Sequence, residues 1–226
     1  MWFGSSCAFQ LENAFASRRG NIWMFCCPGS ERRSFSMANS PRRNDGVELH
    51  VRLLPGGLFS EQICPGLVPG SSLLRLELPF GGFGLREDSD RPIVMVASGT
   101  GFSPIQSILH DLFERNLGRD VRLYWGARRR KDLYALDVPQ TWAEAHENFK
   151  FIPVLSEPDV SDGWVGRVGL VHRAVLDDFP TLENHEVYAC GVPAMVDAAR
   201  RDFVQLRGLP ADNFFADSFV SSSDTR

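Results

Sequence analysis

The sequence predicts a β module followed by an α/β module: a small antiparallel β-barrel, then a doubly wound parallel sheet. Residues 47–53 alternate between apolar and polar side chains, which is typical of a half-buried strand. Residues 92–97 form a continuous apolar run, as a strand buried on both faces requires. Helical and strand patterns then alternate, which predicts βαβ units with right-handed crossovers.

The composition is that of an ordinary folded protein, because 226 residues with 43% hydrophobic side chains can bury a substantial core. A net charge of -4 argues against a nucleic-acid partner, since such proteins usually carry a basic face. No apolar run reaches the roughly 20 residues of a membrane-spanning helix. The five cysteines are irregularly spaced and include no C-x-x-C pair. We therefore expect no membrane span and a reducing compartment, the cytoplasm.

The first 28 residues differ in character from the rest. They show neither strand nor helix periodicity and lack the basic start and cleavage site of a secretory signal. When residues 21–27 are back-translated and read two nucleotides later, the result, PGQYLDVLLP, alternates like a β-strand. We hypothesise that residues 1–28 are out of frame and that the proper frame begins near Pro28. Related genes without a single-base insertion or deletion there would contradict this.

The β module is predicted over residues 29–90. A second strand is expected over 73–78, and Gly and Pro punctuate the strand ends, as in the turn at 55–57. The α/β module is predicted over residues 91–226. Its expected elements after the first strand are a helix over 104–114, a strand over 121–125, a helix over 141–148, a strand over 149–155, a helix over 172–178, a strand over 186–189 and a helix over 193–206.

A glycine turn stands directly between the first buried strand and its helix, in the segment ASGTGFSP (97–104). Backbone N–H groups in such a turn can approach an anionic pyrophosphate, and the helix N-terminus adds about half a positive charge. This favours dinucleotide binding. Alternatively, the two glycines only close a strand-to-helix turn, and the segment is not the GxGxxG fingerprint.

The segment RSFSMAN (33–39) in the β module combines three groups that suit a flavin. Arg33 can clamp a phosphate, Phe35 can lie against a flat ring, and Ser36 can hydrogen-bond a ring nitrogen. An edge strand with one buried aromatic explains the same pattern. The turn PGGLFS (55–60) could hold a diphosphate on its N–H groups and the Ser60 hydroxyl, although alone this is a weak signal.

The segment VYACGVP (187–193) is again strand, turn and helix. Ligands of open α/β sheets bind beyond the carboxyl ends of the strands, so Cys190 and Gly191 would face the same crevice as the first glycine turn. A small thiol and a glycine leave room for a nicotinamide ring. A buried structural cysteine is the alternative.

Arg128, Arg129, Arg130 and Lys131 form the one dense basic run. It is either a solvated loop or a phosphate-reading segment, and this leaves the choice between NADH and NADPH open. The five histidines show no metal-ligand spacing, so no metal site is expected, and no hydrolase motif is present.

These motifs occur together in one order: RSFSMAN, GGLFS, ASGTGFSP, LYWGARRRKDLY, VYACGVP and FFADSF. In this the chain resembles the ferredoxin-NADP reductase superfamily, and within it the group of CDP-6-deoxy-delta-3,4-glucoseen reductases and oxygenase reductases. The resemblance covers about residues 28–219.

The resemblance implies that the β module binds FAD and the α/β module NAD(P)H. Arg33 would contact the FAD phosphate, Phe35 would stack on the isoalloxazine, and Phe219 would lie near a ring face. The candidate cofactor-binding residues are Arg33, Ser34, Phe35, Ser36, Met37, Gly56, Gly57, Ser60, Gly99, Thr100, Gly101, Pro104, Arg128, Cys190, Gly191 and Pro193. The candidate catalytic residues are Ser36, Cys190 and Phe219.

The chain departs from the family pattern in three respects. Phe35 stands where the family more often has Tyr, which removes a hydrogen bond worth about 1 kcal/mol. The C-x4-C-x2-C ligands of a plant-type [2Fe–2S] module are missing from the sequence. The first strands of the flavin barrel are also expected to be missing, so the barrel would be incomplete, with an unpaired edge.

The expected function is electron transfer from NADH or NADPH through FAD to an iron–sulfur protein or oxygenase component. The two redox rings would be held face to face, one anchored in each module. The alternative is a non-catalytic fragment that binds nucleotide but not flavin.

Overall fold

The computed structural model describes residues 2–3, 6–11, 22–26, 32–43, 46–53, 55–67, 75–80 and 82–219. The chain divides into two compact units, which we call the β unit (residues 1–85 and 106–115) and the α/β unit (residues 86–105 and 116–226). Their architectures confirm the predicted fold class. The functional ranges 29–90 and 91–226 stay predictions.

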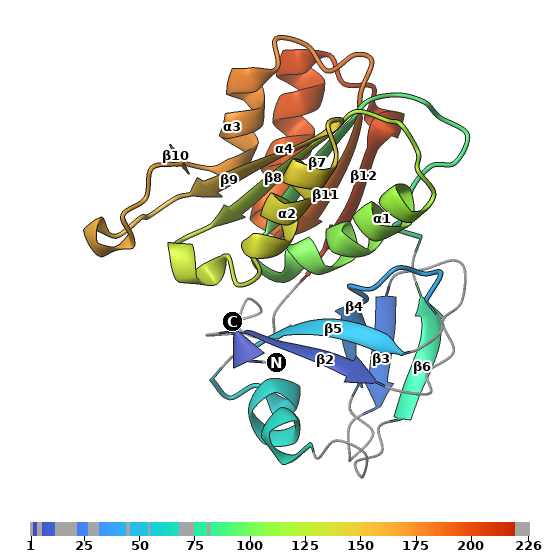
Figure 1. The fold of residues 1–226 in the computed structure, drawn as a ribbon, viewed down its shortest axis with the longest axis vertical. Coiled ribbons are helices and arrows are strands. Elements are labelled where there is room, and N and C mark those ends of the chain that lie inside the picture. Colours follow the sequence, from blue (N-terminus) through green and yellow to red (C-terminus); the bar gives the residue numbers. More distant parts are fainter. Residues whose placement is uncertain are drawn as a thin grey trace. The chain divides into compact units, whose positions relative to one another are not determined.

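The α/β unit is built on a six-stranded parallel sheet in the order β10-β9-β8-β7-β11-β12 (Figure 1). The strands are β7 (Ile93–Ser98), β8 (Val121–Ala127), β9 (Phe149–Leu155), β10 (Arg167–Val168), β11 (Glu186–Gly191) and β12 (Phe214–Ser218). The helices are α1 (Phe102–Glu114), α2 (Asp137–Ala145), α3 (Val171–Asp178) and α4 (Pro193–Arg207). Helix α1 begins in this unit, and from Gln106 onward its residues belong to the β unit.

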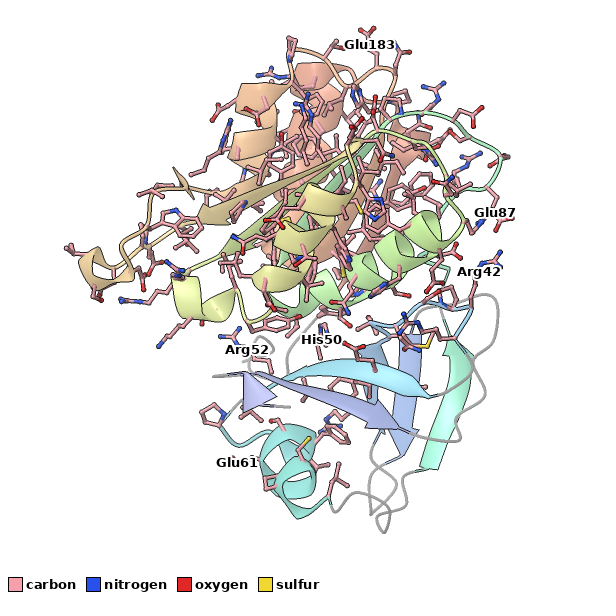
Figure 2. All side chains as sticks on the ribbon, viewed as in Figure 1. Arg42, His50, Arg52, Glu61, Glu87 and Glu183 are labelled. Atoms are coloured by element: carbon pink, nitrogen blue, oxygen red, sulfur yellow. The ribbon has the colours of Figure 1, made fainter. Side chains whose placement is uncertain are left out.

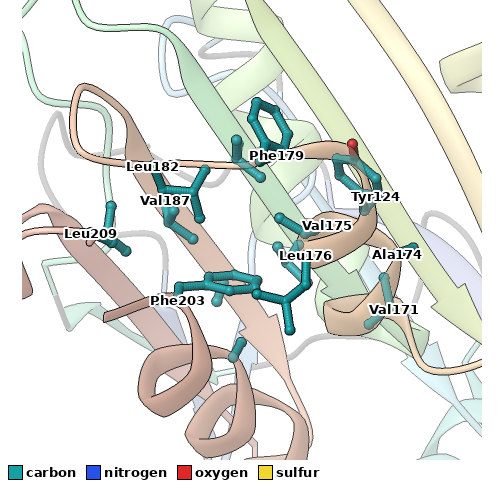
Figure 3. Close-up of a cluster of buried hydrophobic side chains, with 14 of the residues drawn as sticks. Tyr124, Val171, Ala174, Val175, Leu176, Phe179, Leu182, Val187, Phe203 and Leu209 are labelled. Atoms are coloured by element: carbon teal, nitrogen blue, oxygen red, sulfur yellow. The ribbon is translucent and has the colours of Figure 1, made fainter. Parts of the chain in front are cut away.

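The core of the α/β unit explains why its strands read as apolar runs. Five residues of β7 and all six of β11 are buried, because helices cover both faces of the sheet. Helices α3 and α4 cover one face, where Val175 and Phe203 pack against Val187 and Tyr124 (Figures 1 and 3). Burial along the whole strand is confined to the centre of the sheet, because β10 and β12 at its edges alternate between less exposed and more exposed residues.

Most predicted elements of the α/β unit are confirmed, and β9 has the predicted bounds, 149–155. Helix α2 begins at Asp137, four residues before the predicted start at Thr141. Pro139 lies in its first turn, where a missing N–H costs no helical hydrogen bond. Strands β10 and β12 were not predicted. Among the described residues, no helix combines the length and the apolar character needed to cross a membrane.

The β unit contains two three-stranded antiparallel sheets, β1-β2-β5 and β4-β3-β6 (Figure 1). The strands are β1 (Trp2–Phe3), β2 (Ser6–Leu11), β3 (Ile22–Cys26), β4 (Arg32–Ser36), β5 (Val47–Arg52) and β6 (Arg75–Phe80). A bridge between Met37 and Leu49 joins the end of β4 to β5. Strands β1, β2 and β3 lie within residues 1–28, where the sequence pattern predicted no strand.

Strand β3 lies in the segment whose sequence shows no strand periodicity. Its sequence, IWMFC, does not alternate, yet it pairs with β4 on one side and β6 on the other. Pairing on both sides supplies partners for its backbone groups whatever its side-chain pattern. The proposed change of frame near Pro28 lies outside the described residues.

Polar contacts explain why residues 106–115 of α1 belong to the β unit. The Ser107 hydroxyl donates to the Asn39 carbonyl at 2.7 Å, and the Gln106 amide donates to the Glu48 carboxylate at 3.2 Å. Arg42 pairs with Asp111 at 3.0 Å. These bonds join helical residues to a segment that lies 58 to 69 positions earlier in the chain.

Candidate functional site

The carboxyl ends of β7 and β11 define the candidate dinucleotide site. The two strands are parallel neighbours in the middle of the sheet, with β8 on one side and β12 on the other. Strand order reverses between them, and ligands of open α/β sheets bind at such a switch point. Ser98 ends β7 and Gly191 ends β11.

The turn η3 (Gly99–Gly101) leaves β7 and leads into α1. Gly99 has a φ of +53°, a left-handed conformation that favours glycine. Gly101 is packed against the end of β11, because an added Cβ would lie 2.1 Å from the Cys190 carbonyl oxygen. The turn therefore has space for backbone and none for a side chain at residue 101.

Gly191 is closely packed on the other side of the switch point. Its φ is +150°, and an added Cβ would lie 2.0 Å from Ser98 Oγ. The Val192 N–H donates to that same Ser98 oxygen at 3.2 Å. The Phe219 N–H donates to the Gly191 carbonyl at 3.0 Å, which ties the predicted ring-facing Phe219 to the strand end.

Two aromatic side chains that sequence reasoning missed support the turn from inside. Trp125 is fully buried, and its indole N–H donates to the Gly99 carbonyl at 3.0 Å. The Phe102 ring stacks on the indole with centroids 4.0 Å apart and planes 16° apart. An apolar strand ending in Trp gives no signal of this contact, because its partner lies in another segment.

Cys190 is fully buried in β11. Burial, with the charge of Asp217 as a smaller cause, raises the pKa of its thiol well above the ordinary value. The thiol is therefore protonated at neutral pH and does not act as a thiolate. Its burial agrees with the alternative of a structural cysteine, and a role beside the nicotinamide stays a prediction.

The remaining predicted residues of the α/β unit lie at the same edge of the sheet or begin helices there. Pro104 is buried in the first turn of α1, and Pro193 begins α4. Arg128 directly follows β8, with 78% of its side chain exposed and its Nε 4.0 Å from Glu157.

Two further arginines of the basic run, Arg129 and Arg130, contact an acidic and a carbonyl group. Arg129 pairs with Asp159 at 2.8 Å, and Arg130 donates to the Asp162 carbonyl at 3.3 Å. Two hydrogen bonds from Ser161 and one from Arg129 lower the pKa of Asp159 to about 2, so it is ionised at neutral pH. The run is thus partly neutralised.

The predicted flavin residues Arg33 to Ser36 lie on β4, at the edge of its sheet, and Met37 follows the strand directly. Ser36 is buried, whereas Arg33 and Phe35 are half-buried. The Phe35 ring packs against Phe59 with centroids 4.8 Å apart. Ser34 is exposed and Met37 is fully buried, so Met37 has no surface for a ligand. The edge-strand alternative thus describes the local structure, and it leaves part of the Phe35 ring accessible.

The predicted diphosphate turn is followed by a six-residue π-helix, η1 (Leu58–Ile63). The Gly56 N–H donates to the carboxylate of Glu61, which is labelled in Figure 2. A carboxylate therefore holds one of the N–H groups that the diphosphate interpretation needs. Ser60 is buried, and Gly57 is half-buried at the start of the helix.

The chain is similar to known reductases over most of its length. A family model described as "Oxidoreductase NAD-binding domain" matches residues 95–201. The chain is 45% identical to the CDP-6-deoxy-L-threo-D-glycero-4-hexulose-3-dehydrase reductase of Yersinia pestis over 85% of this chain, and it spans 56% of that protein. It is 32% identical to the NAD(P)H-flavin reductase of Vibrio harveyi, covering 92% of this chain and 89% of that one.

A solved structure agrees with these relatives. The Amycolatopsis cytochrome P450 reductase GcoB matches with a TM-score of 0.84 and 32% identity, over 96% of this chain and 65% of the other.

Proposed function

Because the chain belongs to the ferredoxin-NADP reductase superfamily, we propose that it is an NAD(P)H-dependent flavoprotein reductase. It takes electrons from a reduced nicotinamide dinucleotide, uses FAD, and passes the electrons to a one-electron acceptor. The observation that supports this proposal most directly is the close packing of Gly101 on Cys190 at the switch point. A turn built of bare backbone at that place suits a pyrophosphate.

The α/β unit supplies the dinucleotide site. The 13-residue helix α1 follows the turn directly, so its partial positive charge adds to the N–H groups of Gly99, Thr100 and Gly101. Gly191 lies beside the turn at the end of β11, where the nicotinamide end would bind. Phe219, anchored to Gly191, follows the last strand.

The β unit supplies the flavin site, and its residue types fit that cofactor. Arg33 would bind a phosphate, the accessible part of Phe35 would contact the ring system, and Ser36 would hydrogen-bond near the reactive nitrogen. When bound there, a flavin would supply the chemistry that links two-electron hydride transfer to one-electron transfer. The chain's own contribution is to bind and orient both groups and exclude water, and it needs no general base.

An iron–sulfur protein or an oxygenase component is the proposed electron acceptor. Relatives named as reductases of a dehydrase and of a cytochrome P450 support a partner of this kind. The competing function is a nucleotide-binding protein without flavin. The Glu61 carboxylate at the Gly56 N–H favours it, because a carboxylate repels a diphosphate.

The absorption spectrum of the purified chain tests the proposed function. We expect FAD to give a band at about 450 nm that is bleached by NADH under anaerobic conditions. The variant Glu61→Gln should retain at least as much flavin as the wild type, because it removes the negative charge. A colourless protein that still binds NAD+ would establish the competing function, and one that binds neither would contradict both.

The surroundings of the basic run predict a preference for NADH over NADPH. Arg129 and Arg130 are already engaged, and Glu157 places a negative charge 4.0 Å from Arg128. The variant Glu157→Gln removes this negative charge, so it should raise kcat/KM for NADPH and leave kcat/KM for NADH unchanged. The rise should be only a few-fold, because solvent screens exposed charges.

Two further variants complete this test. Arg128→Ala should raise the KM for NADPH alone. Glu147→Gln is the matched control, because Glu147 is exposed at the other end of β9. A wild-type chain that prefers NADPH would show that the run reads a 2′-phosphate.

A further inference from the structure

The peptide group between Gly99 and Thr100 has one side fixed by the protein. The Gly99 carbonyl accepts from the Trp125 indole N–H at 3.0 Å and also from the Phe102 backbone N–H. Trp125 has 0% exposure, so this carbonyl points toward the interior. Phe102 contributes twice, because its ring also stacks on the indole.

The planarity of the peptide group carries this orientation across the bond. In a trans peptide the C=O and the N–H point in opposite directions, so a carbonyl held inward turns the following N–H outward. The Thr100 N–H therefore points away from the buried indole, at the N-terminal end of α1. Gly99 can take the required φ of +53° because it is a glycine.

We propose that Trp125 is a positioning residue for the dinucleotide: its indole N–H holds the Gly99 carbonyl and thereby aims the Thr100 N–H at the pyrophosphate. This inference rests on the proposed function and adds a residue that touches neither cofactor. The Trp125 side chain is held in place by packing, because the Tyr134 ring lies edge-on against the indole with centroids 5.3 Å apart. The turn is thus oriented before the ligand arrives.

The variant Trp125→Phe separates the hydrogen bond from the packing, because it keeps an aromatic ring and removes the N–H. In the intact chain we expect the Kd for NAD+, measured by titration calorimetry, to rise about three- to tenfold, the effect of one lost hydrogen bond. The KM for NADH should rise similarly with ferricyanide as acceptor, while kcat stays within about twofold. A general loss of structure would lower kcat as well.

Trp142→Phe is the matched control. Trp142 lies on α2 in the same aromatic cluster, with its ring centroid 6.4 Å from that of Phe102. We expect this variant to bind NAD+ as the wild type does. If Trp125→Phe fails to fold, Phe102→Leu tests the same support, since it removes the ring stacked on the indole, and it should weaken NAD+ binding.

The outcomes separate this inference from the proposed function. A wild-type chain that does not bind NAD+ would overturn the proposed function and this inference with it. A wild type that binds NAD+, together with a Trp125→Phe variant that binds it equally well or loses affinity by the same factor as Trp142→Phe, would overturn the positioning role alone.

Discussion

Replacing Gly101 by alanine is expected to weaken NAD+ binding by about 100-fold, the scale of a misplaced binding group. The new Cβ would lie 2.1 Å from the Cys190 carbonyl oxygen and 2.5 Å from its carbon. Both atoms belong to backbone inside the central sheet, so the turn must move instead. We expect the free energy of unfolding to fall by about 1–3 kcal/mol, the usual cost of overpacking.

Two other glycines control for this effect. Gly118→Ala places a Cβ with no atom within 4 Å and no strained φ, so binding and stability should stay unchanged. Gly99→Ala also has open space but a φ of +53°, and it should cost about 1–2 kcal/mol through backbone strain alone. Wild-type NAD+ affinity in Gly101→Ala would show that the turn does not form the binding site.

A buried ion pair at the other end of the same sheet carries the second large expected effect. Arg119 donates to the Glu186 carboxylate at 2.7 Å, and the two side chains are only 6% and 2% exposed. Arg119 also donates to the carbonyls of Arg91 at 2.7 Å and Arg86 at 3.3 Å. The Tyr188 hydroxyl donates to Glu186 at 3.0 Å, which completes the network.

The variant Arg119→Met should lower the free energy of unfolding by about 3 to 5 kcal/mol, because it leaves the Glu186 charge buried without its partner. Urea unfolding measures this loss. Arg128→Met is the matched control, since the Arg128–Glu157 pair is 78% and 61% exposed and should contribute less than about 1 kcal/mol. An equal loss of unfolding free energy in the two variants would contradict the stabilising role of the buried Arg119–Glu186 pair.

The same network predicts a dependence of stability on pH. Burial alone would raise the pKa of Glu186, but hydrogen bonds from Ser89 and Arg119 and the charge of Arg119 outweigh it, so the pKa is lowered. A carboxyl with a lowered pKa stabilises the folded state fully above its unfolded pKa, about 4.3, and less as the pH falls further. Wild-type stability should drop below about pH 4.3, and Arg119→Met should show a smaller drop.

Local patterns were sufficient to predict most elements of the α/β unit, because its central strands are buried along their length. Strand β9 has the predicted bounds, and α3 begins one residue before its predicted start. Parallel strands are buried on both faces, so they must be apolar along their length. Helix α2 was placed less well, because a proline in the first turn resembles a breaker in the sequence alone.

The β unit was harder, and β3 shows why. A strand between two others is held by backbone hydrogen bonds, so its side chains need not alternate clearly, and IWMFC does not. Strand β4 contained the predicted flavin residues, yet its position at a sheet edge depends on pairing with residues 22–26.

Local sequence patterns were enough to predict most of the strand and helix alternation from β7 to α4, the turn that follows β7 and the strand end that faces it. These follow from periodicity, glycine placement and the rule that ligands bind at carboxyl ends. Local patterns gave no indication that Gly101 packs against the Cys190 carbonyl, that the Trp125 indole donates to Gly99, or that Arg119 pairs with Glu186. These partners lie up to 89 residues apart, and packing rather than any local preference brings them together.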